Sequence, residues 1–306
     1  MALTLAITGG TGFVGKHALA QAVARGHTVR ALARKPQPAG HGITWIAGSL
    51  ETPASLAALV DGADAVIHIA GVTNARSRAE FAAGNAGGTA AMRAVTGKLP
   101  FVHVSSLAAR EPSLSLYGAS KRQAEDVARG VAGPWAMLRP PAVYGPGDTE
   151  LLALFKAARL GLVPVPAGAR ASMLYARDLA GALVALAEDL AGAQLSVGKI
   201  FEIDDGAGGY SQAEIAQAAA TAMGKNVRVI PVAGAALKLA AAFDTAVSKL
   251  RGKLPTLSFD RAGYLAHKDW TAASAPLIAT GIWRPETPLD VGMVQTVTWY
   301  RTQGWL

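Results

Sequence analysis

The chain has 306 residues, of which 51% are hydrophobic and 16% are charged, and these proportions are typical of a compact globular protein rather than a disordered one. It contains no cysteine, which excludes disulfide bonds, thiolate metal sites and a cysteine nucleophile. The net charge of +8 comes from scattered lysines and arginines, without a dense basic tract or interleaved aromatic residues. We therefore expect no nucleic-acid partner.

Two features of the sequence bear on its compartment. The first strand is expected to begin at Leu3, which leaves no room for a signal peptide. The apolar run Val232–Phe243 is short and carries Lys238, so we expect no membrane-spanning segment. The simplest expectation is a cytoplasmic protein without stable membrane insertion, either a monomer or a homodimer.

The N-terminal segment has the pattern of a strand, a glycine-rich turn and a helix. The apolar run Leu3–Ile7 predicts a buried parallel strand, and Phe13–Arg25 predicts a helix that ends before Gly26. Between them lies Thr8-Gly9-Gly10-Thr11-Gly12-Phe13-Val14-Gly15, in the position of a dinucleotide-binding loop. An ordinary turn between a strand and a helix is the alternative.

Each of three glycines in this turn has a separate expected role. Gly9 allows the tight turn after the strand, and Gly12 lets the backbone approach a pyrophosphate without an intervening Cβ. Gly15 allows the helix to pack closely on the sheet. The N–H groups of the first helical turn then face the anion.

The rest of the first half alternates strands and helices, as a Rossmann-type doubly wound parallel sheet requires. The expected strands are Thr28–Leu32, Ile43–Ile46, Ala65–Ile69, Phe101–Val104 and Trp135–Leu138, and the expected helices are Pro53–Val60, Gly88–Thr96 and Leu116–Arg129.

The pattern changes after about residue 145, where proline and glycine become frequent and strands such as Lys199–Ile203 and Val227–Ile230 are isolated. We predict a dinucleotide-binding domain over residues 1–150. Residues 151–306 are expected to form mainly a smaller, interleaved α/β lobe that binds substrate, with some segments returning to the first domain. A ligand cleft is expected between this lobe and the carboxyl ends of the strands.

A tyrosine and a lysine, Tyr117 and Lys121, are spaced to lie on one face of a helix. A nearby ammonium stabilises a phenolate, so we expect Lys121 to lower the pKa of Tyr117 and make it a general acid or base. Eleven residues before Tyr117, a predicted strand ends in Ser105 and Ser106. One hydroxyl at this edge can polarise a substrate carbonyl, and we choose Ser106, because strand alternation turns the two to opposite faces. A serine that only caps a loop is the alternative.

With these residues, the chain resembles the extended branch of the short-chain dehydrogenase/reductase superfamily, the NAD-dependent epimerase/dehydratase family. The resemblance runs nearly end to end through Thr8–Gly15, Ile67–Gly71, Asn85–Thr89, Ser105-Ser106, Tyr117-x-x-x-Lys121, Leu138–Gly147, Tyr175–Leu179 and Trp299–Leu306. It implies that Ser106 orients the substrate oxygen, that Tyr117 transfers the proton, and that Lys121 holds the nicotinamide ribose. The residues expected to bind the cofactor are Gly9, Thr11, Gly12, Phe13, Val14, Gly15, Arg34, Ala70, Gly71, Asn85, Lys121 and Pro140.

The segment after the second strand departs from the pattern of NAD-binding proteins, which place an acidic residue there to bind the ribose hydroxyls. Here the sequence reads Arg30-Ala31-Leu32-Ala33-Arg34-Lys35, without a carboxylate. Arg34, with Arg30 or Lys35, can instead neutralise a 2′-phosphate, so we favour NADP over NAD as the cofactor. A solvated basic turn is the alternative.

A second departure concerns the substrate. Members of this family that act on nucleotide sugars often carry an asparagine near residues 140–145, where this chain reads Pro140-Pro141-Ala142-Val143-Tyr144-Gly145. We therefore expect hydride transfer to or from a carbonyl or alcohol carbon of a small, apolar substrate. The pocket is expected to use Leu107, Leu114, Leu116, Val143, Leu151, Leu154, Phe155, Met173 and Leu174, although Arg76, Arg78 and Arg170 could still bind an anionic group.

Two other functions remain open from the sequence. One is a nucleotide-sugar epimerase or dehydratase with transient hydride transfer, and the other is a non-catalytic NADP(H)-binding subunit or sensor. The six histidines have no metal-ligand spacing, so no metal is expected, and His68 and His103 are interpreted as core residues or neighbours of the cofactor. The amphipathic stretch Leu237–Leu250 is interpreted as a helix over the substrate cleft, with contact to a membrane surface as the less favoured interpretation.

Overall fold

In this computed structural model the described residues are 1–130, 132–233 and 267–306, together with positions 236, 239, 242, 244, 263 and 264. A central sheet of parallel strands has the order β11-β6-β5-β4-β1-β2-β3. Its strands are β1 (Thr4–Thr8), β2 (Thr28–Ala33), β3 (Ile43–Ala47), β4 (Ala65–His68), β5 (Phe101–Val104), β6 (Trp135–Arg139) and β11 (Lys199–Glu202). The strand order reverses direction between β1 and β4, which is where doubly wound sheets bind ligands.

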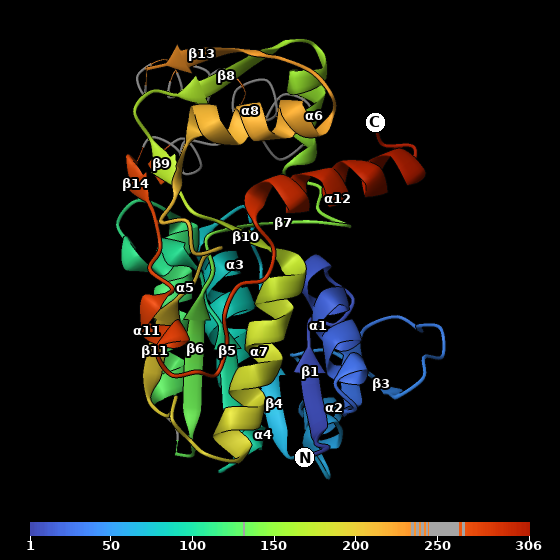
Figure 1. The fold of residues 1–306 in the computed structure, drawn as a ribbon. Coiled ribbons are helices and arrows are strands. Elements are labelled where there is room, and N and C mark those ends of the chain that lie inside the picture. The colour runs from blue at the N-terminus through green and yellow to red at the C-terminus, as the bar shows by residue number, and fades with distance from the viewer. Residues whose placement is uncertain are drawn as a thin grey trace.

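Helices cover both faces of this sheet (Figure 1), which confirms the predicted Rossmann-type α/β class. One face packs against α1 (Phe13–Ala24) and α7 (Ala176–Ala191), and the core there contains leucines and valines of both helices. The other face packs against α2 (Pro53–Val60), α4 (Gly88–Thr96) and α5 (Leu116–Arg129). The predicted strands and helices of the first half agree with the observed ones within one residue at each end. Periodicity succeeds here because the central strands β1, β4 and β5 are buried on both faces, whereas the helices bury one face each.

Several segments beyond residue 150 pack on the central sheet and belong to the first domain. Helix α7 lies on the sheet, β11 pairs with β6 at its edge, and α11 (Ala275–Ile278) contributes Leu277 to the same core. Asp178 on α7 accepts hydrogen bonds from the backbone N–H groups of Glu286 (3.1 Å) and Thr287 (2.8 Å). This buried carboxylate holds the C-terminal segment against the sheet domain.

A smaller lobe stands above the carboxyl ends of the strands (Figure 1). It contains α6 (Leu152–Arg159), α8 (Gln212–Ala222), α12 (Leu289–Thr302) and the parallel pair β8 (Leu162–Pro166) and β13 (Arg228–Val232). Ser211 and Glu214 form a capping box that opens α8. Two further small sheets connect the lobe to the main domain: β7 (Ala142–Tyr144) with β10 (Met173–Tyr175), and β9 (Arg170–Ala171) with β12 (Tyr210–Ser211) and β14 (Asp269–Trp270).

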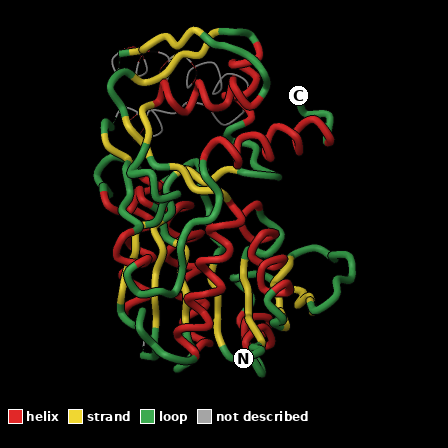
Figure 2. The backbone as a smooth tube through the Cα atoms, in the orientation of Figure 1, coloured by secondary structure: helices red, strands yellow, loops and turns green. Residues whose placement is uncertain are grey.

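Figure 2 distinguishes the helices and strands from the loops that connect them. The connection from β2 to β3, which contains Arg34, is a loop that projects from the side of the sheet domain. A short helix α3 (Arg78–Ala82) runs into a π-helical turn over Ala83–Gly87 ahead of α4, and a 3₁₀ turn over Leu107–Arg110 follows β5. Of the helix predicted at Leu237–Leu250, only positions 239, 242 and 244 are described, and the rest lies outside the described residues. None of the described helices is long and apolar enough to cross a membrane.

Candidate active site and cofactor cleft

In the turn between β1 and α1, the backbone leaves no room for a Cβ at Gly9 or at Gly15. Gly9 has a φ of +75°, and a Cβ on it would lie 2.7 Å from the backbone nitrogen of Ala70. A Cβ on Gly15 would overlap the Gly9 carbonyl group, whose carbon would be 2.7 Å away. The Gly12 N–H donates to the Gly9 oxygen at 2.9 Å and closes the turn. The spacing of these glycines is therefore explained by backbone contacts, which require glycine at positions 9 and 15.

The N-terminus of α1 fits an anionic group. Gly12 is its N-cap residue and has no side chain, so the N–H groups of Phe13, Val14 and Gly15 are not capped by it. By contrast, Ser115 at the N-cap of α5 accepts a hydrogen bond from the Gly118 N–H at 2.9 Å. Exposed N–H groups and the positive end of the helix dipole together favour a phosphate. The residues of this turn thus fit the pyrophosphate of a dinucleotide.

The ends of β1 and β4 are joined by buried polar contacts. The Thr8 hydroxyl is 2.8 Å from Nδ1 of His68 and accepts a hydrogen bond from the Ala70 N–H at 3.2 Å. His68 stacks on His103 at a ring-centroid distance of 5.6 Å. Burial lowers the pKa of His68 to about 3 and that of His103 well below its usual value, so both rings are neutral at physiological pH. His68 is therefore a hydrogen-bonded core residue, whereas the described residues provide no partner for either ring nitrogen of His103.

Asn85 lies in the π-helical turn and is only 1% exposed. Its side-chain oxygen accepts a hydrogen bond from the Val72 N–H at 2.9 Å, and its nitrogen donates to the Val72 oxygen at 3.0 Å and the Ser120 hydroxyl at 2.8 Å. A Cβ on Gly71 would lie 2.6 Å from the same amide oxygen. Asn85 thus fastens the loop after β4 to α5, a role that the sequence did not indicate.

Ser106, Tyr117 and Lys121 come together where β5 and α5 meet. Ser106 follows β5, and its hydroxyl accepts a hydrogen bond from the Ala108 N–H at 3.2 Å and also bonds the Tyr117 phenol. Lys121, one helical turn after Tyr117, is 5% exposed and donates to the Val104 carbonyl oxygen at 2.6 Å. A hydroxyl, a phenol and an ammonium group therefore lie at the carboxyl edge of the sheet, where Ser106 and Lys121 are buried and Tyr117 is partly buried.

The pKa of Tyr117 differs in direction from what the sequence led us to expect. Burial lowers the pKa of Lys121 to about 8, partly opposed by the charge of Glu125, so the amine is still largely protonated at pH 7. Burial raises the pKa of Tyr117, and only the hydrogen bond from Ser106 opposes that increase. The expectation that Lys121 lowers the pKa of Tyr117 is thus wrong for this structure, because desolvation outweighs the other effects and the ammonium donates to a backbone carbonyl.

The two serines after β5 point to different partners, as strand alternation predicted. Ser105 donates to Oε1 of Glu125 at 2.6 Å, and Glu125 is fully buried. Arg139 donates to both oxygens of that carboxylate, each at 2.8 Å. This buried pair joins β5, α5 and β6 behind the site. Sequence reasoning missed Glu125, although its spacing of four residues from Lys121 on an amphipathic helix was an available signal.

Of the basic residues considered for the 2′-phosphate, Arg30 on β2 already has hydrogen-bond partners. Arg30 donates to the carbonyl oxygens of Leu59 (3.2 Å) and Ala58 (2.6 Å), at the C-terminus of α2. It therefore stabilises the end of that helix and is not free to bind a phosphate. Arg34 and Lys35 are exposed at the carboxyl end of β2 and form no ion pair with other described residues.

The loop after β7 closes over the start of α1. Nε2 of His17 is 2.8 Å from the Pro146 oxygen, and its ring packs edge-on against Phe13 at 5.6 Å. The Pro140 oxygen accepts a hydrogen bond from the Leu107 N–H at 2.9 Å, which links the end of β6 to the segment that carries Ser106. Segments far apart in the chain therefore meet around the predicted cofactor-binding turn.

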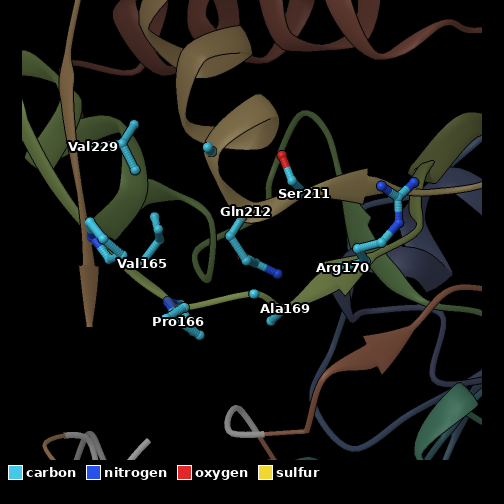
Figure 3. A pocket seen from close by; sticks show the side chains of 11 residues that line it. Val165, Pro166, Ala169, Arg170, Ser211, Gln212 and Val229 are labelled. Atoms are coloured by element: carbon cyan, nitrogen blue, oxygen red, sulfur yellow. The ribbon is translucent and has the colours of Figure 1, made fainter. Parts of the chain in front are cut away.

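Part of the expected substrate pocket is hydrophobic core. Leu107, Phe155, Met173 and Leu174 are at most 1% exposed and pack in the cores of the molecule, whereas the other predicted apolar residues are more accessible. A separate cavity of about 430 Å³ lies in the small lobe (Figure 3). It is lined by Val165, Pro166, Ala167, Gly168, Ala169, Arg170, Ser211, Gln212, Ala213, Val229 and Pro231. None of the site residues described above lines it, so it is distinct from the candidate active site. The described residues contain no cluster of His, Asp or Glu that could hold a metal ion.

Comparison with characterised proteins identifies a relative that aligns with nearly the whole chain and another that aligns with about half of it. A ceramide reductase of Caulobacter vibrioides is 39% identical over 311 residues, which covers 99% of this chain and 96% of that protein. A 4-hydroxy-2-methyl-3-oxo-4-farnesyl-3,4-dihydroquinoline-1-oxide ketoreductase of Stigmatella aurantiaca is 34% identical over 173 residues, 48% of this chain and 52% of its own.

Solved structures share the fold at low sequence identity. A human epimerase family protein solved with NADPH has a TM-score of 0.74 and 21% identity, covering 97% of this chain and 99% of that one. The Bordetella bronchiseptica enzyme WbmG, solved with NAD and UDP, has a TM-score of 0.71 and 18% identity, covering 100% and 97%. These structures contain different nicotinamide cofactors, so they do not distinguish NADP from NAD for this chain.

The family model of the NAD-dependent epimerase/dehydratase family matches residues 5–203, which include the glycine turn and the Ser106, Tyr117 and Lys121 site. The chain belongs to this family of extended short-chain dehydrogenases/reductases and is an NAD(P)-dependent oxidoreductase.

Proposed function

We propose that this protein reduces the ketone of an apolar, lipid-like substrate with NADPH. The observation that carries the proposal is the buried arrangement of Ser106, Tyr117 and Lys121 at the carboxyl edge of the sheet. A hydroxyl donor, a proton donor and a cation are the groups that carbonyl reduction requires.

In this mechanism, a bound reduced nicotinamide supplies the hydride to the carbonyl carbon. Ser106 donates a hydrogen bond to the carbonyl oxygen and polarises it. Tyr117 gives its phenolic proton to that oxygen as negative charge develops there. The Lys121 ammonium, one helical turn away and largely protonated at pH 7, would hold the nicotinamide ribose beside the phenol.

The turn from Gly9 to Gly15 and the uncapped start of α1 support binding of the pyrophosphate, and the loops at Ala70, Gly71 and Pro140 border the same edge. The exposed guanidinium of Arg34, aided by Lys35, supports a preference for the 2′-phosphate of NADPH. Asn85 would act through the position of the loop after β4 rather than by direct contact.

The names of the relatives and the sequence both support an apolar substrate. The Caulobacter relative is named for ceramide, and the Stigmatella relative for a farnesyl-bearing quinoline. Both names describe substrates with long apolar chains, and this chain lacks the asparagine of nucleotide-sugar enzymes at residues 140–145. We therefore infer a long-chain ketone, with ceramide-type lipids as the first class to test.

The experiment measures NADPH consumption with a panel of long-chain ketones, including keto-sphingolipids, beside UDP-sugars. We expect turnover with lipid ketones, and Tyr117→Phe should reduce kcat by about a hundredfold or more because the proton donor is lost. Tyr210→Phe, which removes a phenol in the small lobe that bonds Asp205, is the matched control and should retain activity. Conversion of a UDP-sugar without net NADPH consumption would replace the proposal with an epimerase function, and full activity of Tyr117→Phe would refute the mechanism.

A further inference from the structure

One face of the two-stranded sheet of the small lobe is exposed and is not covered by other described elements. Strands β8 and β13 are parallel, with Leu162 beside Arg228 and Pro164 beside Ile230, so these four residues share a face. The alternate residues of β8 are buried against α6 and α8. Figure 1 shows both strands at the end of the molecule farthest from the N-terminus. The uncovered face is therefore an outer surface of the lobe.

This face is apolar at its centre. Leu160 is 82% exposed at the end of α6, Leu162 is 46% exposed, and Ile230 is 38% exposed. Pro164 on the same face is also exposed. An exposed patch of large aliphatic side chains often marks an interaction site.

Among the described residues of this surface, the charged side chains around the apolar centre are all cations. Lys156 and Arg159 on α6, Lys225 before β13 and Arg228 on β13 are all exposed. The Lys225 ammonium donates to the Arg159 carbonyl oxygen at 3.1 Å, which brings the two segments together. Residues 151–177 and 215–233, which build this surface, contain no Asp or Glu. None of the four cations takes part in an ion pair with other described residues.

We propose that this basic apolar surface docks on an anionic lipid bilayer. Aliphatic side chains enter the boundary between headgroups and acyl chains, while the surrounding cations bind lipid phosphates. A symmetric contact with a second copy would place these like charges opposite one another, which disfavours dimerisation through this face. The proposal depends on the surface alone and does not require the lipid substrate proposed above.

The test is co-sedimentation of the full chain with vesicles of phosphatidylglycerol and phosphatidylcholine, compared with vesicles of phosphatidylcholine alone. We expect binding to the anionic vesicles that weakens as salt is added. Arg159→Glu should lower the partition coefficient by at least about fivefold. The double variant Leu160→Ser and Leu162→Ser should lower it by roughly tenfold.

Matched controls lie on the sheet domain. Lys98→Glu makes the same change of charge on an exposed residue there, and Leu195→Ser removes a side chain that is 52% exposed. Both should bind like the unmodified protein, and all variants should retain their unfolding temperature. Equal binding to neutral vesicles, equal loss in the controls, or a dimer that dissociates in the Leu160/Leu162 variant would overturn the proposal. Turnover of a water-soluble ketone should be unchanged in every variant, so failure of this proposal is distinguishable from failure of the proposed reaction.

Discussion

Replacement of Lys121 by methionine should stabilise the protein at neutral pH while it removes activity. The ordinary lysine pKa of 10.5 falls to about 8 in the folded protein because the side chain is buried. Below pH 8 the side chain is buried in its charged form, and the pKa difference means that this burial lowers the free energy of unfolding by about 3 kcal/mol. Loss of the bond to the Val104 oxygen should cost about 1 kcal/mol. Lys121→Met should therefore be about 2 kcal/mol more stable than the unmodified protein at pH 7.

The pH dependence gives this prediction its sharpest test. Between pH 8 and 10.5 the unfolded chain binds more protons at Lys121 than the folded chain does, so the stability of the unmodified protein should rise over this window relative to the variant. Urea unfolding of both proteins at pH 7, 8, 9 and 10 measures the difference between their free energies of unfolding. The contributions of the other titrating groups are the same in both proteins and cancel in this difference. Lys98→Met, at an exposed lysine, is the control and should show no such change. A variant less stable at pH 7, or a difference that does not shrink with pH, would refute the reasoning.

Five other substitutions have distinct expected outcomes. Ser106→Ala should lower kcat with little effect on stability. Ser105→Ala should instead destabilise the fold by about 1–3 kcal/mol, since the buried carboxylate of Glu125 loses a hydrogen-bond donor. Measurements of kcat and of urea unfolding distinguish the two outcomes. Gly15→Ala should abolish cofactor binding and destabilise the protein by about 3 kcal/mol or more, because its Cβ meets immovable backbone; near-normal NADPH titration would contradict this. Arg34→Ala should weaken NADPH binding by about 1–3 kcal/mol and barely change NADH binding in calorimetry; equal losses would favour a solvated turn. His103→Phe should resist acid unfolding better, because the folded protein disfavours a charged ring below its ordinary pKa; an unchanged acid midpoint would argue against this.

The sequence predicted the elements of the sheet domain closely because their signals are local. Burial of a strand on both faces demands a continuous apolar run, and a tight turn with a positive φ at Gly9 demands glycine. The placement of Tyr117 and Lys121 on one face of α5 follows from helical spacing alone. Strand alternation likewise separated Ser106 from Ser105, since neighbouring side chains on an extended backbone leave on opposite sides.

Other properties depend on which distant segments meet, and only the tertiary structure decided them. The sequence could not show that Arg30 is occupied by carbonyl groups of α2, or that Asn85 is committed to the loop after β4. Nor could it show that Glu125 and Arg139 form a buried pair behind the site. The pKa of Tyr117 rises because desolvation depends on everything packed around the phenol, whereas helical spacing reports a single neighbour. Local geometry thus determined which groups are present, and long-range packing determined which of them are free to act and with what charge.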